Sequence, residues 1–493
     1  MTHGTQKSDS RIVPAKRANK AAHAAAEPVE GRRGTVGNVE AQSTDRTQSR
    51  DAVSQARSRI RAAIARNKTE RLTALMHHIT VDALRHAFFT LKKRAAAGID
   101  AQTWGDYAGS LEENLQTLHD RLHRGAYRAL PSRRVYIPKP DGKQRPLGVA
   151  AIEDKIVQAA VVLILTPIYE AEFLGFSYGF RPGRGQHDAL DALAFGIKER
   201  KVRWVLDADI RSFFDTINHH WMIKFIEHRI GDKRIVRLIQ KWLSAGAMEN
   251  GLRVATEEGT PQGAVISPLL ANIYLHYVYD LWINAWRKRH AAGDMIVVRY
   301  ADDTVVGFQF EGDARNFLRD LKERLAQFGL ELHADKTRLL AFGRFVAKNR
   351  ALRGLGRPET FDFLGFTHIC GVTRDGGHFQ LQRKTKRKRK WATIQRVGLE
   401  LQRIRHSPID EQGRWLATVL KGHYAYFAVP TNMDALRALW HHVKVRWYLS
   451  LRRRSQRRRL TWPRMNAIAA KYLPLPSIVH PWPDRRFLVK HPR

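Results

Sequence analysis

The sequence predicts an α+β fold in which helices pack against a small antiparallel sheet. Residues 295–308 hold two runs rich in β-branched residues on either side of Asp302 and Asp303, which is typical of a hairpin with a polar tip. Residues 203–209 form a third apolar run that ends in an acidic residue and leads into helix-like sequence. From residue 382 onward, apolar residues recur at helical spacing. We therefore expect the strands in the middle of the chain and helices after them.

The acidic residues at these strand ends indicate a metal site. Adjacent Asp302 and Asp303 repel each other, so a cation is expected at the tip of the hairpin. Taken alone, the pair fits a solvated turn at least as well. Asp209 changes the balance, because it ends the earlier strand and can face the pair across a sheet. Three carboxylates suit two Mg²⁺ ions, since magnesium takes oxygen ligands and completes its shell with substrate phosphates.

Composition indicates a large polyanionic partner. The chain has 493 residues, enough for two or three domains, and a formal net charge of +38. Self-repulsion of this size opposes compactness unless phosphates or counterions offset it, so nucleic acid is the expected partner. No apolar run reaches the roughly 20 residues that span a bilayer, and the polar start predicts no secretory signal, so we expect a cytoplasmic protein without membrane contact. The single cysteine, Cys370, excludes an internal disulfide and a multi-cysteine zinc site.

A Gly/Pro-rich turn at residues 258–263, which contains Pro261, Gln262 and Gly263, leads into a helix and lies between the two acidic segments. The first acidic strand, the Pro-Gln-Gly turn and the Tyr-Ala-Asp-Asp hairpin occur in this order, and the sequence resembles the reverse transcriptase/maturases of bacterial group II introns. The resemblance extends from about Gly98 to about Tyr448. It implies a right-hand polymerase with fingers and palm followed by a helical thumb. With one cysteine, the chain resembles the short type that lacks a C-terminal endonuclease domain.

This resemblance and the composition together predict the domain boundaries. Residues 1–65 are polar, rich in Ala and Arg and without periodicity, and are expected to be a disordered basic arm. The fingers and palm are expected over 66–370 and the helical thumb/maturase domain over 371–460. Residues 461–493 are rich in proline and basic residues and are expected to form an irregular extension.

The remaining elements follow from local signals. Thr80 is a plausible N-cap for a helix whose apolar residues follow at helical spacing. Residues 133–148 read as a hairpin around Pro140-Asp-Gly, and 156–173 as a buried helix. Ser267 is expected to cap the helix that follows the Gly/Pro turn, and 361–366 to be a short aromatic strand. Asn432 is a cap-like start for a further helix.

The resemblance assigns nucleotide contacts. Lys139 and Arg145 match fingers residues that grip the triphosphate, and an arginine fork can pair two phosphate oxygens at once. Phe214 matches an aromatic residue that leaves no room for a 2′-hydroxyl; the alternative is a core aromatic. Gln262 is a nucleotide or template contact, and Lys336 matches a basic residue near the leaving pyrophosphate.

Basic residues are the candidates for template and RNA contacts. Arg181 and Arg184 follow a glycine-rich segment and are interpreted as template contacts, although a structural turn with one docking arginine fits as well. Two basic runs, 383–390 and 452–459, flank a helix with tryptophans. Basic runs are often solvated faces, but this arrangement favours RNA binding. The candidates on the thumb are Lys386, Arg387, Lys388, Arg437, Lys444 and Arg446.

The resemblance implies an RNA-directed DNA polymerase. Asp209, Asp302 and Asp303, with the carbonyl of Ile210, would hold two Mg²⁺ ions while a primer 3′-hydroxyl attacks the α-phosphate of a dNTP. The implied partners are an RNA template, a DNA primer, group II intron RNA and target DNA. The alternatives are an RNA-binding splicing cofactor with little polymerase activity and a reverse transcriptase adopted for host defence or repair. An RNA polymerase is disfavoured, because Phe214 should exclude ribonucleotides.

Overall fold

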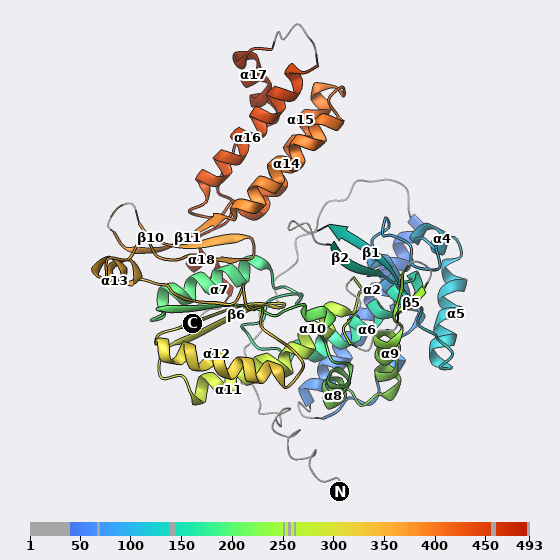
Figure 1. Ribbon diagram of the computed structural model, residues 1–493. Helices are drawn as coiled ribbons and strands as arrows, with labels where there is room; N and C mark the ends of the chain where they lie inside the picture. The colour runs from blue at the N-terminus through green and yellow to red at the C-terminus, as the bar shows by residue number, and fades with distance from the viewer. Residues whose placement is uncertain are drawn as a thin grey trace. The chain divides into compact units, whose positions relative to one another are not determined.

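The computed structural model describes residues 40–490 apart from a few short segments (Figure 1). The segments outside the description are 67–69, 139–143, 250–251, 255–257, 261–262, 374, 376 and 455–459. The fold is α+β, as the sequence predicts, and the chain divides into two compact units. Unit 1 takes residues up to 175, 210–285 and 322–331, and unit 2 takes 176–209, 286–321 and residues from 332 onward.

Unit 1 is mainly helical and carries one small sheet. Its four strands run in the order β2-β1-β4-β5, with β1 and β2 forming the predicted hairpin. The strands are β1 (Ser132–Pro138), β2 (Gln144–Val149), β4 (Ala247–Glu249) and β5 (Leu252–Val254). The helices are α2 (Glu40–Arg66), α3 (Val81–Thr90), α4 (Trp104–Ala108), α5 (Leu111–His123), α6 (Ile152–Glu170), α8 (His219–Arg229), α9 (Lys233–Ser244) and α10 (Ser267–Leu275). Short turns of 3₁₀-helix lie at Met76–His78 and Phe213–Asp215, and a π-turn lies at His276–Asp280.

Helix α2 corrects the expected disordered arm over residues 1–65. Residues 40–66 form one long helix, and residues 1–39 lie outside the described residues. Val53, Ile60 and Ile64 are buried, and α2 lies against α3 and α6. These apolar residues are widely spaced among polar ones, so the helix gains its apolar contacts from tertiary packing that composition does not reveal.

Of the three expected helix caps, two occupy the N-cap position and one does not. The Thr80 side chain accepts a hydrogen bond from the backbone of Ala83, as an N-cap does. Ser267 is the first residue of α10 rather than its cap. Asn432 occupies the N-cap position of α16, as expected, but its side chain makes no cap bond; its amide is buried and bonds to Thr385 and to the carbonyl of Phe427.

Unit 2 contains the sheet that carries the acidic residues. We call β6-β7-β3-β8 the acidic sheet; its neighbouring strands are all antiparallel. The strands are β3 (Trp204–Asp209), β6 (Met295–Tyr300), β7 (Asp303–Phe308) and β8 (Arg338–Ala341). The predicted hairpin at 295–308 is confirmed as β6 and β7. In Figure 1, helices α7 (Gln186–Glu199) and α12 (Glu311–Ala326) lie on opposite sides of these strands.

A second sheet and a helical bundle complete unit 2. The sheet has the order β11-β10-β9, and the expected single strand at 361–366 is in fact the start of this hairpin system. Its strands are β9 (Phe361–Phe363), β10 (Phe366–Val372) and β11 (Phe379–Thr385). The helices of unit 2 that remain are α13 (Val346–Leu352), α14 (Arg387–Arg403), α15 (Ile409–Phe427), α16 (Met433–Arg452), α17 (Trp462–Tyr472) and α18 (Pro483–Lys490), while α11 (Leu281–Arg289) begins in unit 1. Residues 461–493, expected to be irregular, therefore contain two helices.

One hydrophobic core joins the acidic sheet to the helical bundle, which we define as α14–α17. Val205, Val298 and Val305 of the sheet belong to the same buried cluster as Leu190 of α7 and Trp447 of α16. The structure thus groups the acidic sheet with the bundle, whereas the sequence-based boundary near residue 370 separates them. No helix in the described part of the chain combines the length and apolar character needed to cross a bilayer.

Candidate active site

A buried arginine donates hydrogen bonds that stabilise the Tyr300–Asp303 turn. Arg299, 1% exposed, donates from Nη1 to the Ala301 carbonyl (2.9 Å) and from Nη2 to Ser177 Oγ (2.7 Å). Ala301 has a left-handed backbone, with φ of 56°. Gly179 makes the close approach possible, because a Cβ there would lie 2.2 Å from the Ala301 nitrogen. The segment before α7 therefore fixes the turn that carries Asp302.

Asp209 and Asp303 face each other at the ends of β3 and β7. They are direct partners in the antiparallel register, so the predicted convergence across the sheet is confirmed for this pair. The pKa of Asp303 is raised to about 7, first by desolvation of its carboxylate by surrounding protein atoms and then by the charges of Asp302 and Asp209. The residue as a whole is nevertheless exposed at the turn. Lys336 provides the nearest cation: its Nζ lies 2.6 Å from Asp209 Oδ2.

Asp207 belongs to the same row of acids, and the sequence analysis missed it. Successive residues of a strand point to opposite faces, so Asp207 and Asp209 share one face of β3. Burial raises the pKa of Asp207 to about 7, while Arg338, 3.9 Å away, opposes the rise. The period-2 spacing of the two aspartates was the available signal.

The donor set fits magnesium, but its side chains are not arranged as a binding site. Carboxylate oxygens are the hard ligands that Mg²⁺ takes. Desolvation raises the pKa of Asp303 most, and a divalent cation would relieve the repulsion from Asp302 and Asp209 that adds to it. Within the described ranges, no group of three or more His, Cys, Asp or Glu side chains stands in position to hold a metal ion. The Lys336 ammonium instead neutralises Asp209.

The raised pKa of Asp303 predicts a pH-dependent stability without metal. Its ordinary pKa is 3.8, so between about pH 4 and pH 7 the unfolded chain releases a proton that the folded protein retains. The folded state therefore loses stability as pH rises through this window. We expect Asp303→Asn to have a smaller loss in the free energy of unfolding than wild type between pH 5 and pH 8, in urea titrations with EDTA. Exposed Asp335→Asn is the control, and an unchanged slope for Asp303→Asn would contradict the assignment.

Several nucleotide candidates lie in unit 1. Phe214 is half-buried in the 3₁₀ turn, edge-on to the core residue Phe213 with ring centres 5.4 Å apart. Thr260 donates its backbone N–H to the Phe214 carbonyl at 2.8 Å, which ties the turn to the Gly/Pro segment. Arg145 is exposed on β2, and Ile210 is buried. Lys139 and Gln262 lie outside the described residues.

A cavity lies next to this turn within unit 1. Its volume is about 310 Å³, and its lining includes Arg134 of β1, Gly148 of β2, Asp215 and Gly259. Gly263 has φ of +108°, and a Cβ there would lie 2.9 Å from the Gly148 carbonyl oxygen, so only glycine brings the turn this close to β2.

Some of the basic residues expected to contact template or RNA are instead buried or paired with other protein groups. Arg181, 6% exposed, is buried and donates to the Ser177 carbonyl, which fits the alternative of a structural turn with a docking arginine. Arg184 is half-buried over the Tyr178 ring, at 5.4 Å. Lys386 pairs with Asp362 at 2.9 Å.

On the helical bundle, the candidates are mostly accessible. Arg387, Lys388, Arg437 and Arg446 are exposed. The Lys444 ammonium lies over two tryptophan rings, 4.8 Å from Trp440 and 5.8 Å from Trp462. This surface combines cations with aromatic rings, as nucleic-acid-binding surfaces do.

Comparison with known proteins gives the class. The family model described as reverse transcriptase (RNA-dependent DNA polymerase) matches residues 137–368, which include every strand of the acidic sheet. Protein YkfC of Escherichia coli is 37% identical over 289 residues, covering 51% of this chain and 75% of YkfC. The chain therefore belongs to the reverse transcriptase family.

Other relatives indicate the kind of reverse transcriptase. The group II intron-encoded protein LtrA of Lactococcus lactis is 44% identical over 171 residues, covering 34% of this chain and 28% of LtrA. A putative COX1/OXI3 intron 1 protein of Saccharomyces cerevisiae is 28% identical over 348 residues, covering 60% of this chain and 41% of that protein. The chain thus spans well under half the length of these two relatives. They support the resemblance to group II intron reverse transcriptase/maturases.

Proposed function

We propose that the chain is the RNA-directed DNA polymerase of a group II intron, which copies intron RNA into cDNA and binds this RNA to assist splicing and mobility. One observation carries the proposal: Asp209 and Asp303 are direct partners at the ends of β3 and β7, beside Asp302, in a member of the reverse transcriptase family. We assign fingers and palm to residues 66–370, a thumb/maturase domain to 371–460, and activity to the bacterial cytoplasm.

In this proposal Asp209, Asp302 and Asp303, with the Ile210 carbonyl, would hold two Mg²⁺ ions. When bound, the ions would activate the primer 3′-hydroxyl and stabilise the leaving pyrophosphate. The chain's own residues set the geometry: Arg299 fixes the turn of Asp302, and the β3–β7 pairing fixes Asp209 against Asp303. Lys336, whose Nζ lies 2.6 Å from Asp209 Oδ2, would be placed to offer its ammonium to the departing phosphate.

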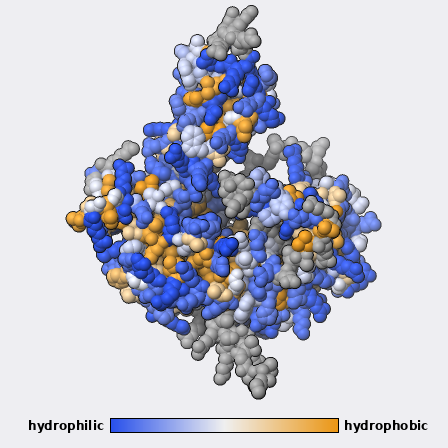
Figure 2. Space-filling model, viewed as in Figure 1, coloured by the Kyte–Doolittle hydropathy of each residue, from blue (hydrophilic) through white to orange (hydrophobic). Residues whose placement is uncertain are grey.

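The helical bundle supplies the proposed RNA-binding surface. Arg387, Lys388, Arg437 and Arg446 are exposed there, and the whole chain carries a formal charge of +38. In Figure 2 hydrophilic residues cover much of the visible face, including large parts of the bundle at the top. Cations of this kind bind phosphates without reading sequence, so affinity for RNA should fall steeply with salt. Target DNA, which carries the same negative charge as RNA, is a further proposed partner.

Phe214 is proposed to select dNTPs by blocking a 2′-hydroxyl, with Arg145, Lys139 and Gln262 as the other nucleotide contacts. We expect Phe214→Val to raise the relative kcat/KM for rNTPs on the order of tenfold or more, because it removes steric bulk beside the sugar. Single-nucleotide incorporation with matched dNTP and rNTP measures the ratio. Phe214→Tyr retains the ring and should keep wild-type selectivity. A wild-type ratio in the valine variant would show that Phe214 is only a core aromatic.

The function is tested by primer extension on an RNA template with Mg²⁺, supplying dNTPs or rNTPs separately. We expect extension with dNTPs alone. A folded protein that binds RNA but does not extend the primer would refute the polymerase assignment and favour an RNA-binding splicing cofactor. Splicing is measured separately, by adding the protein to a self-splicing group II intron RNA at low Mg²⁺.

A further inference from the structure

The segment after α17 returns to the core of unit 2. We call residues 474–490 the strap. The backbone N–H groups of Val479 and His480 both donate to the Ala428 carbonyl at 3.1 Å, just beyond the end of α15. His480 Nε2 also lies 2.9 Å from the Ala425 carbonyl oxygen. The strap then forms α18, which lies beside α7 in Figure 1.

The strap contacts one face of α7 along nearly its whole length. His187 stacks on His480 with ring centres 3.9 Å apart, and Phe195 stacks on Phe487 at 4.5 Å. Lys198 pairs with Asp484 near the end of the helix. With Asp191, these α7 residues recur at spacings of four, four and three, which places them on a single stripe.

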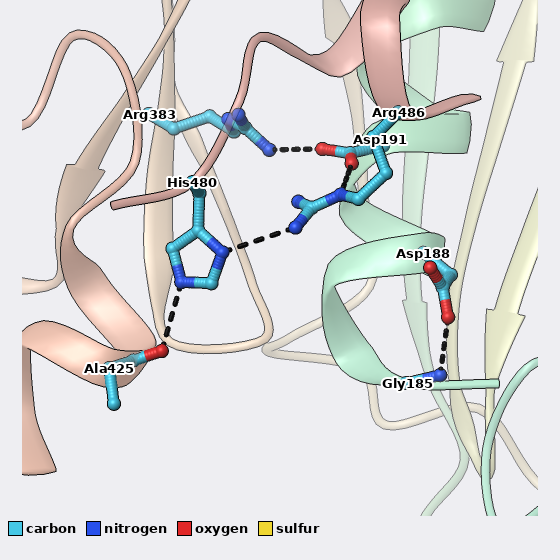
Figure 3. Close-up of polar contacts among 7 residues, drawn as sticks. All are labelled: Gly185, Asp188, Asp191, Arg383, Ala425, His480 and Arg486. Carbon is cyan, nitrogen blue, oxygen red and sulfur yellow. Dashed lines mark hydrogen bonds and ion pairs between the residues drawn. The ribbon is translucent and has the colours of Figure 1, made fainter. Parts of the chain in front are cut away.

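At the middle of this stripe, a buried carboxylate is shared by two arginines (Figure 3). Asp191 is 1% exposed and pairs with Arg383 of β11, 2% exposed, at 2.9 Å. Arg486 of the strap pairs with the other carboxylate oxygen, and its Nη1 lies 3.1 Å from His480 Nδ1. A buried carboxylate is retained only with good partners, so this contact strongly fixes where the strap lies. Arg486 is thereby turned inward, toward Asp191 and His480.

Helix α7 in turn contacts the strand that ends in the acidic turn. Gly196 of α7 lies so close to β6 that a Cβ there would be 2.9 Å from Ile296. The segment just before α7 bonds to β6 as well: the Tyr178 N–H donates to the Arg299 carbonyl at 2.8 Å. Movement of α7 would therefore displace β6 and the backbone of the Asp302 turn.

We propose that the strap is a positioning element of the polymerase site, with Arg486 as its key positioning residue. Through Asp191 it fixes α7, which packs on β6 at Ile296, and the segment just before α7 bonds to Arg299 beside the turn that carries Asp302. The same contact joins α7 to β11, which leads into α14 of the bundle. This inference rests on the proposed polymerase function and gives the strap a role in chemistry rather than in RNA binding.

The test compares neighbouring arginines of α18. Arg486 points inward and Arg485 is exposed, so Arg486→Gln and Arg485→Gln remove the same charge from adjacent positions. We expect Arg486→Gln to lower kcat about tenfold or more, because small displacements of reacting groups are costly, with the Kd for primer–template unchanged within about twofold. Arg485→Gln should keep the wild-type kcat. Arg486→Lys should restore part of the activity, since it keeps the charge.

Two results would overturn the inference. A wild-type kcat for Arg486→Gln, with only a lower Tm, would make the strap a purely stabilising element. Equal losses of RNA affinity in both glutamine variants would make it an RNA-binding tail. If Arg486→Gln does not fold, Arg486→Lys against Arg485→Lys makes the same comparison, with a kcat lowered only at position 486 as the expected result. Failure of wild type to extend a primer would refute the proposed function instead, so the two failures are distinguishable.

Discussion

Asp302→Ala is expected to abolish cDNA synthesis, lowering kcat by about 10³-fold or more, while RNA binding stays within about twofold of wild type. The variant removes one of the three proposed metal-holding carboxylates. RNA affinity should persist, because the exposed cations of α14 and α16, which we propose as the RNA-binding surface, are unchanged. Metal-free stability should also persist, since the substitution removes a charge that repels Asp303.

The measurement pairs primer extension with two binding assays. Filter binding at several salt concentrations follows RNA affinity, and Mn²⁺ binding followed by electron paramagnetic resonance reports the site independently of activity. Asp335→Asn, an exposed aspartate next to Lys336, is the control and should match wild type in all three. Parallel loss of polymerisation and RNA binding would show that Asp302 supports the fold as a whole. Primer extension at the wild-type rate by Asp302→Ala would show that Asp302 is not part of the metal site.

The acidic hairpin was predictable because its signals are local. β-branched runs on both sides of two aspartates specify paired strands, and a third apolar run ending in Asp209 supplies the partner. To predict that Asp209 and Asp303 face each other, it was enough to assume that these strands are neighbours in the sheet. Asp207 could have been predicted in the same way from its spacing to Asp209. It was overlooked because it lies inside an apolar run, and its side of the sheet becomes clear only once the faces of β3 are assigned.

The basic run at 383–390 shows where the sequence was insufficient. Its charge density predicted a surface that contacts RNA, and Arg387 and Lys388 are indeed exposed. Arg383 is instead 2% exposed, because Asp191 provides its partner from a distant part of the chain. Composition cannot identify such a partner. The same limit applies to α2, whose few apolar residues become a packing face only against α3 and α6.

Asp191→Ala is expected to destabilise the protein by about 3–5 kcal/mol, the usual cost of leaving a buried charge without its partner. Arg383 and Arg486 both lose the carboxylate that they share, and Arg383 is too deeply buried to be hydrated instead. Asp188→Ala is a matched control one turn earlier in α7. Its carboxylate accepts a hydrogen bond from the Gly185 N–H at 2.7 Å at the start of the helix, so its loss should cost about 1 kcal/mol (Figure 3).

Urea unfolding of both variants measures this difference, and limited proteolysis locates it. Asp191→Ala should expose the strap, so cleavage within residues 474–490 should precede loss of the bundle, whereas Asp188→Ala should be cut at the wild-type rate. Cleavage of the strap should be faster in Asp191→Ala because Arg486 loses its carboxylate partner, the central polar contact of the strap. Phe487 and His480 keep their ring contacts with α7. Equal destabilisation by the two substitutions would mean that the Asp191 cluster contributes no more than a helix cap. Strong destabilisation without faster cleavage of the strap would assign the effect to Arg383 alone.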